Sequence, residues 1–338
     1  MRPFILSIAL ILVASWTAAF EIENRAQFGP SDSGQLIRII STADIGFFEP
    51  MIMSFLAVYP ETKIDYLVVS STEMMRAIWD EGHSFDLAIS SAMDLQTKLA
   101  NDGKAQRYVS AATQSLPDWA IWNDMLFAFT QEPAAIVVSK NAFGDLPPPK
   151  TRQELINLLR QQPERFRGRV GTYDIRDSGL GYLFATQDTR ASETYWRLTE
   201  VFGALGARLY CCSSEMIEAV KTGELLIAYN VLGSYAVNRE DQSDFDIILP
   251  SDFTTVMLRT AMIPENAPSP ELSKAFMDHL LQETHGQNAP LLIQPGLDLV
   301  KMEAALNRIR MGPGLLVFLD QLKKRAFLTE WESAILQN

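Results

Sequence analysis

Residues 36–44, Leu-Ile-Arg-Ile-Ile-Ser-Thr-Ala-Asp, place a short β-rich run directly before a loop of small and hydroxyl side chains. A helical pattern follows this loop and stops at Pro60, with apolar residues at helical spacing, namely Phe47, Met51, Phe55 and Val58. The same order of strand, loop and helix recurs in residues 64–81 and 86–103. Three such units in succession indicate a parallel sheet covered by helices, because parallel strands need crossover connections.

A second group of strands and helices begins in the middle of the chain. It contains predicted strands at 134–138, 169–173 and 225–230, and helices that begin near Thr151, Gly179 and Ser213. Further strands at 246–250 and 260–264 are expected to return the chain to the first group, and a helix after residues 311–314 to pack on it. The sequence thus predicts an α/β protein with two lobes, each a mainly parallel sheet flanked by helices. Residues 20–133 and 235–338 form lobe 1, and 134–234 form lobe 2.

The composition is that of a folded globular protein. The chain has 338 residues, of which 47% are hydrophobic and 21% charged, so it is too apolar to be disordered. Its formal net charge is −12, from 29 Lys and Arg against 41 Asp and Glu. Such a chain repels phosphate polyanions on average, which argues against general binding of nucleic acids or anionic membranes.

The first residues have the three parts of a secretory signal peptide. Arg2 supplies the positive charge, residues 4–13 form an apolar run, and small residues follow up to Ala19. A membrane anchor is the alternative, but the run is shorter than the ~20 residues that span hydrocarbon. We expect residues 1–19 to be a signal peptide cleaved after Ala19, and the mature protein to be periplasmic.

The two cysteines are adjacent in the sequence. Cys211 and Cys212 cannot build a disulfide framework, and they are either two partly buried thiols or a vicinal disulfide. Since no third soft ligand lies nearby in the sequence, they predict no metal site.

The loops after the predicted strands are rich in hydroxyl and small side chains. The candidates for ligand binding in these loops are Ser41, Thr42, Ser71, Thr72, Ser91, Ser178 and Gly179. Ligands of open parallel sheets bind at the carboxyl ends of the strands, so we expect these loops to converge on one cleft. Ser and Thr also cap helices, and the two roles can coincide because the free amides at a helix N-terminus bind anions.

Charged candidates lie in the same loops. Arg176 would pair with an acidic ligand, or else would be a surface side chain satisfied by Asp174 or Asp177. Asp44 would repel an anion but would accept hydrogen bonds from sugar hydroxyls. We therefore expect a small anionic solute that also carries hydroxyl groups, namely a phosphorylated sugar or a related organophosphate or carboxylate.

Residues 173–182, Tyr-Asp-Ile-Arg-Asp-Ser-Gly-Leu-Gly-Tyr, resemble part of the periplasmic solute-binding proteins of ABC transporters. With the signal peptide and the strand order, the resemblance extends over essentially the whole mature chain and is to the type II group, which includes ferric-ion and phosphosugar binders. It implies a Venus-flytrap protein whose two lobes clamp a ligand and are joined by a two-strand hinge, expected near 131–136 and 229–234. The implied partner is an ABC permease or a sensor histidine kinase in the inner membrane, and the chain is expected to be a monomer.

Iron binding is the alternative that the resemblance raises. Ferric-ion members of the group use adjacent tyrosines near the second hinge crossing, whereas Tyr229 and Tyr235 of this chain are six residues apart. Fe³⁺ also needs several hard anionic ligands, and no spaced set of them completes a site. We therefore predict no metal and no cofactor.

The full set of predicted ligand-binding residues combines the loops with the resemblance. It comprises Ser41, Thr42, Asp44, Ser71, Thr72, Ser91, Arg176, Asp177, Ser178, Gly179, Tyr182, Tyr229, Asn230, Ser234 and Tyr235. A periplasmic enzyme is the alternative from another class. The sequence has no HExxH helix, GxSxG elbow, Walker loop or GxGxxG fingerprint after a strand, so we predict no catalytic residues.

Overall fold

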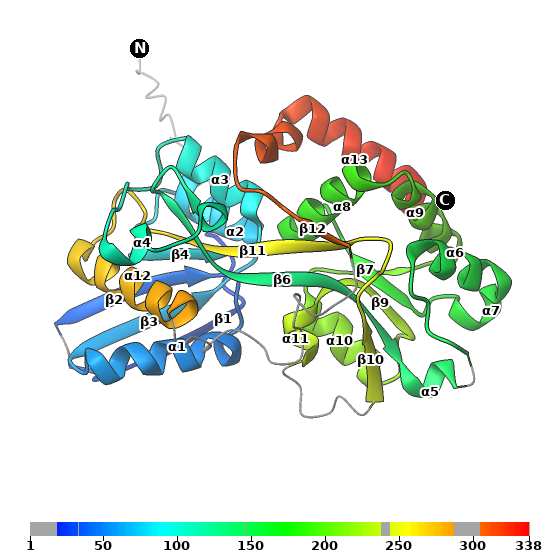
Figure 1. Ribbon diagram of the computed structural model, residues 1–338, viewed down its shortest axis with the longest axis horizontal. Helices are drawn as coiled ribbons and strands as arrows, with labels where there is room; N and C mark the ends of the chain where they lie inside the picture. Colours follow the sequence, from blue (N-terminus) through cyan, green and yellow to red (C-terminus); the bar gives the residue numbers. More distant parts are fainter. Residues whose placement is uncertain (1–18, 33, 145, 238–243, 287–304, 338) are drawn as a thin grey trace, which may run out of the picture.

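The computed structural model describes residues 19–32, 34–144, 146–237, 244–286 and 305–337. These residues form two α/β lobes that are joined by two long strands (Figure 1). The predicted signal peptide, apart from Ala19, lies outside the described residues. None of the helices in the described part of the chain is both long and apolar enough to span a bilayer.

The first lobe contains a sheet in the order β1-β3-β2-β4. Its strands are β1 (Asn24–Phe28), β2 (Gln35–Ser41), β3 (Thr62–Val68) and β4 (Leu87–Ser90). β2 pairs parallel with both β3 and β4, while β1 pairs antiparallel with β3. The helices of this lobe are α1 (Ile45–Val58), α2 (Ser71–Met75) with a π-helical turn (Arg76–Asp80), α3 (Met93–Asn101), α4 (Ala111–Gln114) and α12 (Pro270–His285). The three predicted strand–loop–helix units of this lobe are therefore present.

Two long antiparallel strands, β6 (Leu126–Ser139) and β11 (Thr254–Met262), connect the lobes. The first half of β6 pairs with β11, and its second half pairs with β9 (Ile227–Leu232) and β10 (Phe245–Ile248). Both long strands are almost entirely buried, and polar side chains such as Glu132 and Arg259 are buried with them. The return crossing is therefore β11, which differs from the prediction of a second hinge crossing at 229–234; β9 pairs only with strands of the second sheet.

The second lobe contains the strands β9, β7 (Val170–Tyr173) and β8 (Arg208–Tyr210), in which β7 pairs parallel with both neighbours. Its helices are α5 (Lys140–Phe143), α6 (Arg152–Gln161), α7 (Pro163–Phe166), α8 (Gly179–Ala191), α9 (Thr194–Ala204), α10 (Ser213–Lys221) and α11 (Gly233–Val237). β10 pairs with residues 136–139 of β6 and so belongs to this sheet. The strand predicted at 246–250 does not return the chain to the first lobe, because β11 makes that return.

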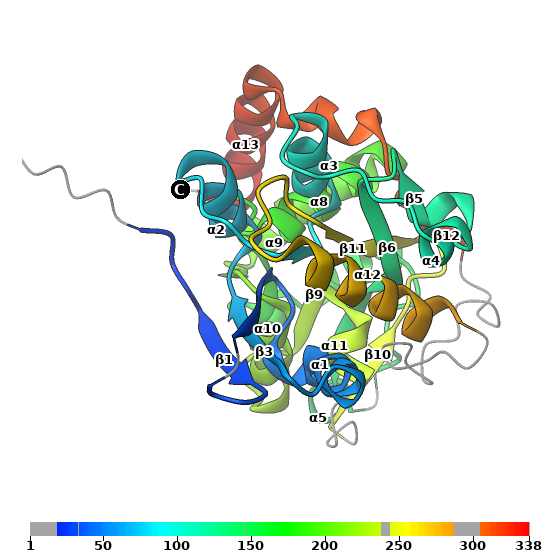
Figure 2. The same ribbon diagram turned by 90° about the vertical axis from the view of Figure 1, so that its left-hand side faces the viewer.

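The C-terminal segment runs from one lobe to the other. β12 (Leu306–Arg308) pairs with β11, the 3₁₀ segment η4 (Pro313–Leu319) contacts α3, and α13 (Gln321–Leu336) packs on α9. In both views α13 lies at the top of the molecule and α1 toward the bottom (Figure 1 and Figure 2). The close packing of α13 on α9 needs Gly203, where a Cβ atom would lie 2.2 Å from the carbonyl oxygen of Ala334. α13 was predicted to pack on lobe 1, but it packs on α9 of lobe 2. An apolar helix face in the sequence does not by itself specify which lobe the helix covers.

Candidate functional site

A cavity of about 70 Å³ lies between the two lobes. It is found where β2, β3, β4, β7 and β8 end, which is the edge at which open parallel sheets bind ligands. The first lobe contributes Glu23, Thr42, Asp44, Val69, Ser70, Ser71 and Ser91 to its lining, and the second contributes Tyr173, Ser178, Leu180, Cys211, Cys212, Ser213, Ser214, Leu232 and Tyr235. A cavity of this size holds a few water molecules.

The N-termini of three long helices face this cavity, as does that of the five-residue helix α2 at Ser70. The residues before α1, α8 and α10 are Asp44, Ser178 and Cys212, and all three line it. The Ser178 hydroxyl accepts a hydrogen bond from the Gly181 amide at 3.1 Å, so it caps α8 and lines the cavity at the same time. Helix N-termini carry partial positive charge and free amides, which favour an anion.

Hydroxyl groups supply most of the remaining polar surface. Thr42 and Ser91 lie 3.3 Å apart through their side-chain oxygens, and the Ser91 amide donates to the Thr42 hydroxyl at 3.1 Å. These two residues follow β2 and β4, so this contact holds the ends of neighbouring strands together. Such hydroxyls can both donate to a charged oxygen and accept from a ligand hydroxyl.

Two carboxylates, Glu23 and Asp44, also line the cavity. Burial raises the pKa of Glu23, and the neighbouring negative charges of Asp44 and Glu215 raise it further. None of the described residues that line the cavity is Lys or Arg. The site therefore pairs helix amides, which suit an acidic group, with carboxylates, which suit hydroxyl donors.

A buried ion pair lies next to the cavity, on the crossing strands. Arg259 of β11 donates to both carboxylate oxygens of Glu132 of β6, at 2.8 and 3.1 Å, and both side chains are buried. Burial alone would favour the neutral form of Glu132, but Arg259 holds its pKa below the usual value. The guanidinium also lies 6.0 Å from the ring of Tyr235, whose hydroxyl accepts from the Asp44 amide at 3.2 Å. Tyr235 therefore connects the hinge to the first lobe.

The lobes are in direct contact beside the cavity. The Thr72 hydroxyl of the first lobe donates to the carbonyl oxygen of Asp177 in the second at 3.0 Å. A Cβ atom on Gly179 would lie 2.6 Å from the Ser71 hydroxyl oxygen and 2.9 Å from a methyl carbon of Leu95. The first turn of α8 thus approaches the first lobe closely because residue 179 has no side chain.

The structure brings six of the predicted residues together around the cavity. These are Thr42, Asp44, Ser71, Ser91, Ser178 and Tyr235, while Thr72, Asp177 and Gly179 lie at the contact between the lobes. The remaining predicted residues have other environments, described next.

Ser41, Ser234 and Tyr182 are buried in the protein and do not line the cavity. The Ser41 hydroxyl accepts from the Tyr66 hydroxyl at 2.8 Å, and the Tyr182 hydroxyl donates to the carbonyl oxygen of Phe318 at 2.6 Å. Ser234 donates to Glu132 and completes the hinge ion pair. The hydroxyl groups of these three residues therefore make hydrogen bonds within the protein, to a neighbouring side chain, to backbone or to the hinge ion pair.

Tyr229 and Asn230 belong to a buried network inside the second lobe. Arg152 donates to the Tyr229 hydroxyl at 2.7 Å, and that hydroxyl and the Asn230 amide nitrogen lie 3.2 and 2.9 Å from a carboxylate oxygen of Asp188. Thr255 of β11 donates to the other Asp188 oxygen at 2.8 Å. Tyr229 does not line the cavity that Tyr235 lines, so the two tyrosines do not face a common site.

Arg176 is paired within the protein. Its guanidinium donates to Asp174, with an Nε–Oδ1 distance of 2.8 Å, and its Nη1 atom lies 3.8 Å from Glu332 of α13. Of the two predicted alternatives, Arg176 is therefore a surface side chain that is paired with Asp174, and it does not line the cavity.

Several lining residues were not predicted. Glu23 directly precedes β1, a strand that was not predicted from the sequence, and Tyr173 ends β7. Ser213 and Ser214 follow a short strand and begin a helix, which is the same signal that identified Ser178. Cys211 and Cys212 are joined by a disulfide and line the cavity beside these serines.

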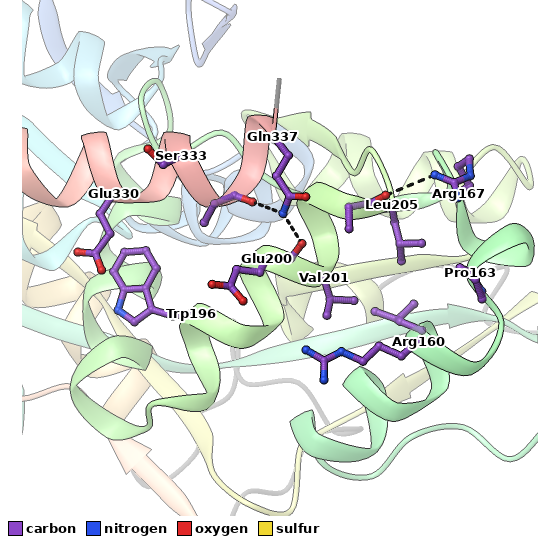
Figure 3. Close-up of a pocket in the computed structure, with 13 residues that line it drawn as sticks. Arg160, Pro163, Arg167, Trp196, Glu200, Val201, Leu205, Glu330, Ser333 and Gln337 are labelled. Carbon is purple, nitrogen blue, oxygen red and sulfur yellow. Dashed lines mark hydrogen bonds between the residues drawn. The ribbon is translucent and has the colours of Figure 1, made fainter.

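A larger groove of about 790 Å³ lies on the second lobe, between α6, α9 and α13 (Figure 3). The Gln337 side chain donates to the carbonyl oxygens of Glu200 and Ala334, at 2.7 and 2.9 Å, so it holds α13 to α9. Arg167 pairs with Glu164 at 3.0 Å. Of the described residues that line the groove, only Pro163 begins a helix, the four-residue α7. The described part of the groove therefore lacks the long-helix N-termini that face the cavity between the lobes.

Comparisons with known proteins agree with this geometry. Residues 37–288 match the family model described as bacterial extracellular solute-binding protein. The crystal structure of the substrate binding protein of an ABC transporter from Agrobacterium tumefaciens is 33% identical, with a TM-score of 0.85 over 92% of this chain and 98% of that one.

More distant structures share the fold. AfuA of Actinobacillus pleuropneumoniae, with exogenous fructose-6-phosphate bound, is 16% identical, with a TM-score of 0.72 over 90% of this chain and 99% of that one. Iron-bound HitA of Pseudomonas aeruginosa is 14% identical, with a TM-score of 0.65 over 89% and 99%. Among curated protein sequences none matches this chain. The similarities confirm the predicted resemblance and the type II periplasmic binding protein fold.

Proposed function

The chain belongs to the bacterial extracellular solute-binding proteins, the substrate-binding components of ABC transporters, and we propose that it clamps a small anionic solute with hydroxyl groups between its lobes. The proposed class is a phosphorylated sugar or a related organophosphate or carboxylate.

The convergence of three helix N-termini on one inter-lobe cavity carries this proposal. The amides before and within the first turns of α8 and α10 would receive the acidic group, and Ser178 and Ser213 would add hydroxyl donors. Glu23 and Asp44 would accept hydrogen bonds from the hydroxyls of the solute. The fructose-6-phosphate bound to AfuA, a protein of the same fold, supports a solute that combines these two kinds of group.

The proposal includes the cellular setting. The signal peptide of residues 1–19 would be removed on export, and the mature monomer would deliver the solute to an ABC permease or present it to a sensor histidine kinase. We assign no catalytic residue, since the family acts in solute binding and transport.

Ferric-ion binding is the second candidate, because iron-bound HitA shares the fold. Among the described residues, no group of three or more His, Cys, Asp and Glu could hold a metal ion. Tyr229 is bonded to Arg152 and Asp188 away from the cavity, and Tyr173, the tyrosine that lines the cavity with Tyr235, shares a hydrogen bond with Ser213. The observations therefore favour the anionic solute.

A thermal-shift screen of the mature protein tests the proposal. The panel contains inorganic phosphate, fructose 6-phosphate, fructose, a hydroxycarboxylate and Fe³⁺. A solute at 100 times its Kd stabilises the folded state by roughly 2.7 kcal/mol, which raises Tm measurably. We expect fructose 6-phosphate or the hydroxycarboxylate to stabilise more than fructose does. Stabilisation by Fe³⁺ alone, or equally by fructose, would contradict the proposal.

A further inference from the structure

The Cys211–Cys212 disulfide forms part of the cleft wall, and the proposed function gives it no role. Both cysteines are half-buried and line the inter-lobe cavity. They connect the end of β8 at Tyr210 to the start of α10 at Ser213. A solute held between the lobes at this cavity would therefore lie against the disulfide.

The disulfide differs chemically from the serines beside it. Its sulfur atoms have no hydrogen to donate and are polarisable and weakly accepting, so they suit contact with carbon rather than with charged oxygen. Leu180 and Leu232 of the same lobe also line the cavity. The second lobe thus offers an apolar surface for the carbon skeleton of a solute, in addition to its helix amides.

The disulfide also restrains the start of α10. Cys212 is the residue before the helix and has an extended backbone, with φ −134° and ψ 147°. The next residue, Ser213, shares a hydrogen bond with the Tyr173 hydroxyl and accepts one from the Leu232 amide at 3.0 Å. A bond between adjacent side chains closes a ring that includes the backbone between them, so it limits movement of the amides that face the cavity.

Reduction would change this wall in a defined way. A dithiol would supply two electrons and two protons, the S–S bond would break, two S–H groups would form, and the dithiol would become a disulfide. Cys211 Sγ lies 3.7 Å from Oε2 of Glu215, a contact that a disulfide sulfur cannot make as a donor but a thiol can. The Cys211 thiol would then point toward Glu215, and the backbone before α10 would regain freedom.

We propose that the Cys211–Cys212 disulfide is a ligand-contacting wall of the cleft and that its reduction to two thiols weakens solute binding. The inference rests on the proposed function, because it assumes that the solute occupies this cavity.

Calorimetric titration with fructose 6-phosphate tests the inference on the oxidised protein, on the protein reduced with dithiothreitol, and on two double variants. C211S/C212S cannot form the bond, and C211A/C212A keeps an apolar wall without it. We expect binding to weaken about tenfold on reduction and in both variants, because a freed loop must be ordered again on binding. Dithiothreitol should not change the affinity of either variant, since the chain has no other cysteine.

Thiol titration and the thermal melts complete the test. The protein as isolated should contain no free thiol, and all four forms should unfold cooperatively without ligand. Equal affinity of the oxidised and reduced forms, or two free thiols in the isolated protein, would overturn the inference. If the oxidised protein binds neither fructose 6-phosphate nor any other anion of the panel, the proposed function fails and the inference with it, while the thiol titration still reports on the bond.

Discussion

The hydroxyl of Thr72 in the first lobe donates a hydrogen bond to the backbone carbonyl of Asp177 in the second lobe, with an oxygen–oxygen distance of 3.0 Å. The bond lies beside the cavity that the two lobes enclose, close to the contact between Ser71 and Gly179. It forms only when the lobes are together, so it stabilises the closed arrangement relative to an open one. A solvent-exposed bond of this kind contributes about 0.5–1.5 kcal/mol.

Replacing Thr72 by Val should therefore shift the protein toward the open arrangement. The substitution keeps the shape of the side chain and removes the donor. We expect T72V to have a larger radius of gyration in small-angle scattering and a solute affinity up to about tenfold weaker. T222V is the matched control, because the Thr222 hydroxyl donates to the Ala219 carbonyl of α10, within the second lobe. A radius and an affinity equal to those of the parent would contradict this role of Thr72.

Replacing Gly179 by Ala should prevent full closure without unfolding either lobe. The added Cβ would lie 2.6 Å from the Ser71 hydroxyl oxygen, across the contact between the lobes. Scattering should show a larger radius, and the affinity for solute should fall, while Tm of the unliganded protein changes little. G181A is the contrast, because its Cβ would lie 2.4 Å from Tyr173 within the second lobe. G181A should lower Tm. If G179A binds solute as tightly as the parent, the close approach of residue 179 to Ser71 is not required for solute binding.

Replacing Ser178 by Asp should abolish binding of an anionic solute. Asp caps a helix as well as Ser does, so Tm of the empty protein should be nearly unchanged. The new carboxylate would occupy the N-terminus of α8 and repel the acidic group, and we expect affinity to fall by about a hundredfold or more. S178N, with the same size and no charge, should retain much more of the affinity. Calorimetric titration compares the three proteins, and equal affinity of S178D and the parent would place the acidic group elsewhere.

Asp94 should make stability depend on pH. This residue lies in the first turn of α3 and is 3% exposed, and burial raises its pKa from 3.8 to about 7, against the opposing effects of the Leu95 amide and Lys324. A folded-state pKa above the unfolded one means that the folded protein holds the proton more tightly. The stabilisation is complete below pH ~4 and is lost as pH rises toward 7.

D94N should therefore be more stable than the parent at pH 8, by up to about 4 kcal/mol, and nearly equal to it at pH 4. Urea unfolding at the two pH values measures the difference. The exposed Asp118 provides the control, because D118N should leave the pH dependence of the parent intact. If D94N and the parent follow the same pH profile, the buried carboxylate has no such effect.

The strands and the loops that follow them could be predicted from the sequence because each signal is local. A short apolar run followed by Ser or Thr marks both a strand end and a helix cap, and this located Thr42, Ser71, Ser91 and Ser178 at the cavity. The same pattern at Ser213 predicted a helix start, and by the same reasoning Ser213 could have been predicted at the cavity.

The hinge and the final helix could not be predicted in this way. β11 contains the fully buried Arg259, and only the pairing of this strand with β6 shows that Glu132 neutralises the guanidinium. Likewise, Tyr229 is used by Arg152 and Asp188, which come from distant parts of the chain. Which partner a buried polar group or an apolar helix face selects depends on tertiary contacts rather than on neighbours in the sequence.

A crystal structure of the mature protein with the strongest binder from the anion panel would locate the acidic group of the solute directly. We predict one solute between the lobes, with its acidic group bonded to amides at the N-terminus of α8 or α10 and its hydroxyls near Glu23 or Asp44. A solute bound in the groove between α6, α9 and α13, or an acidic group away from both helix N-termini, would contradict it.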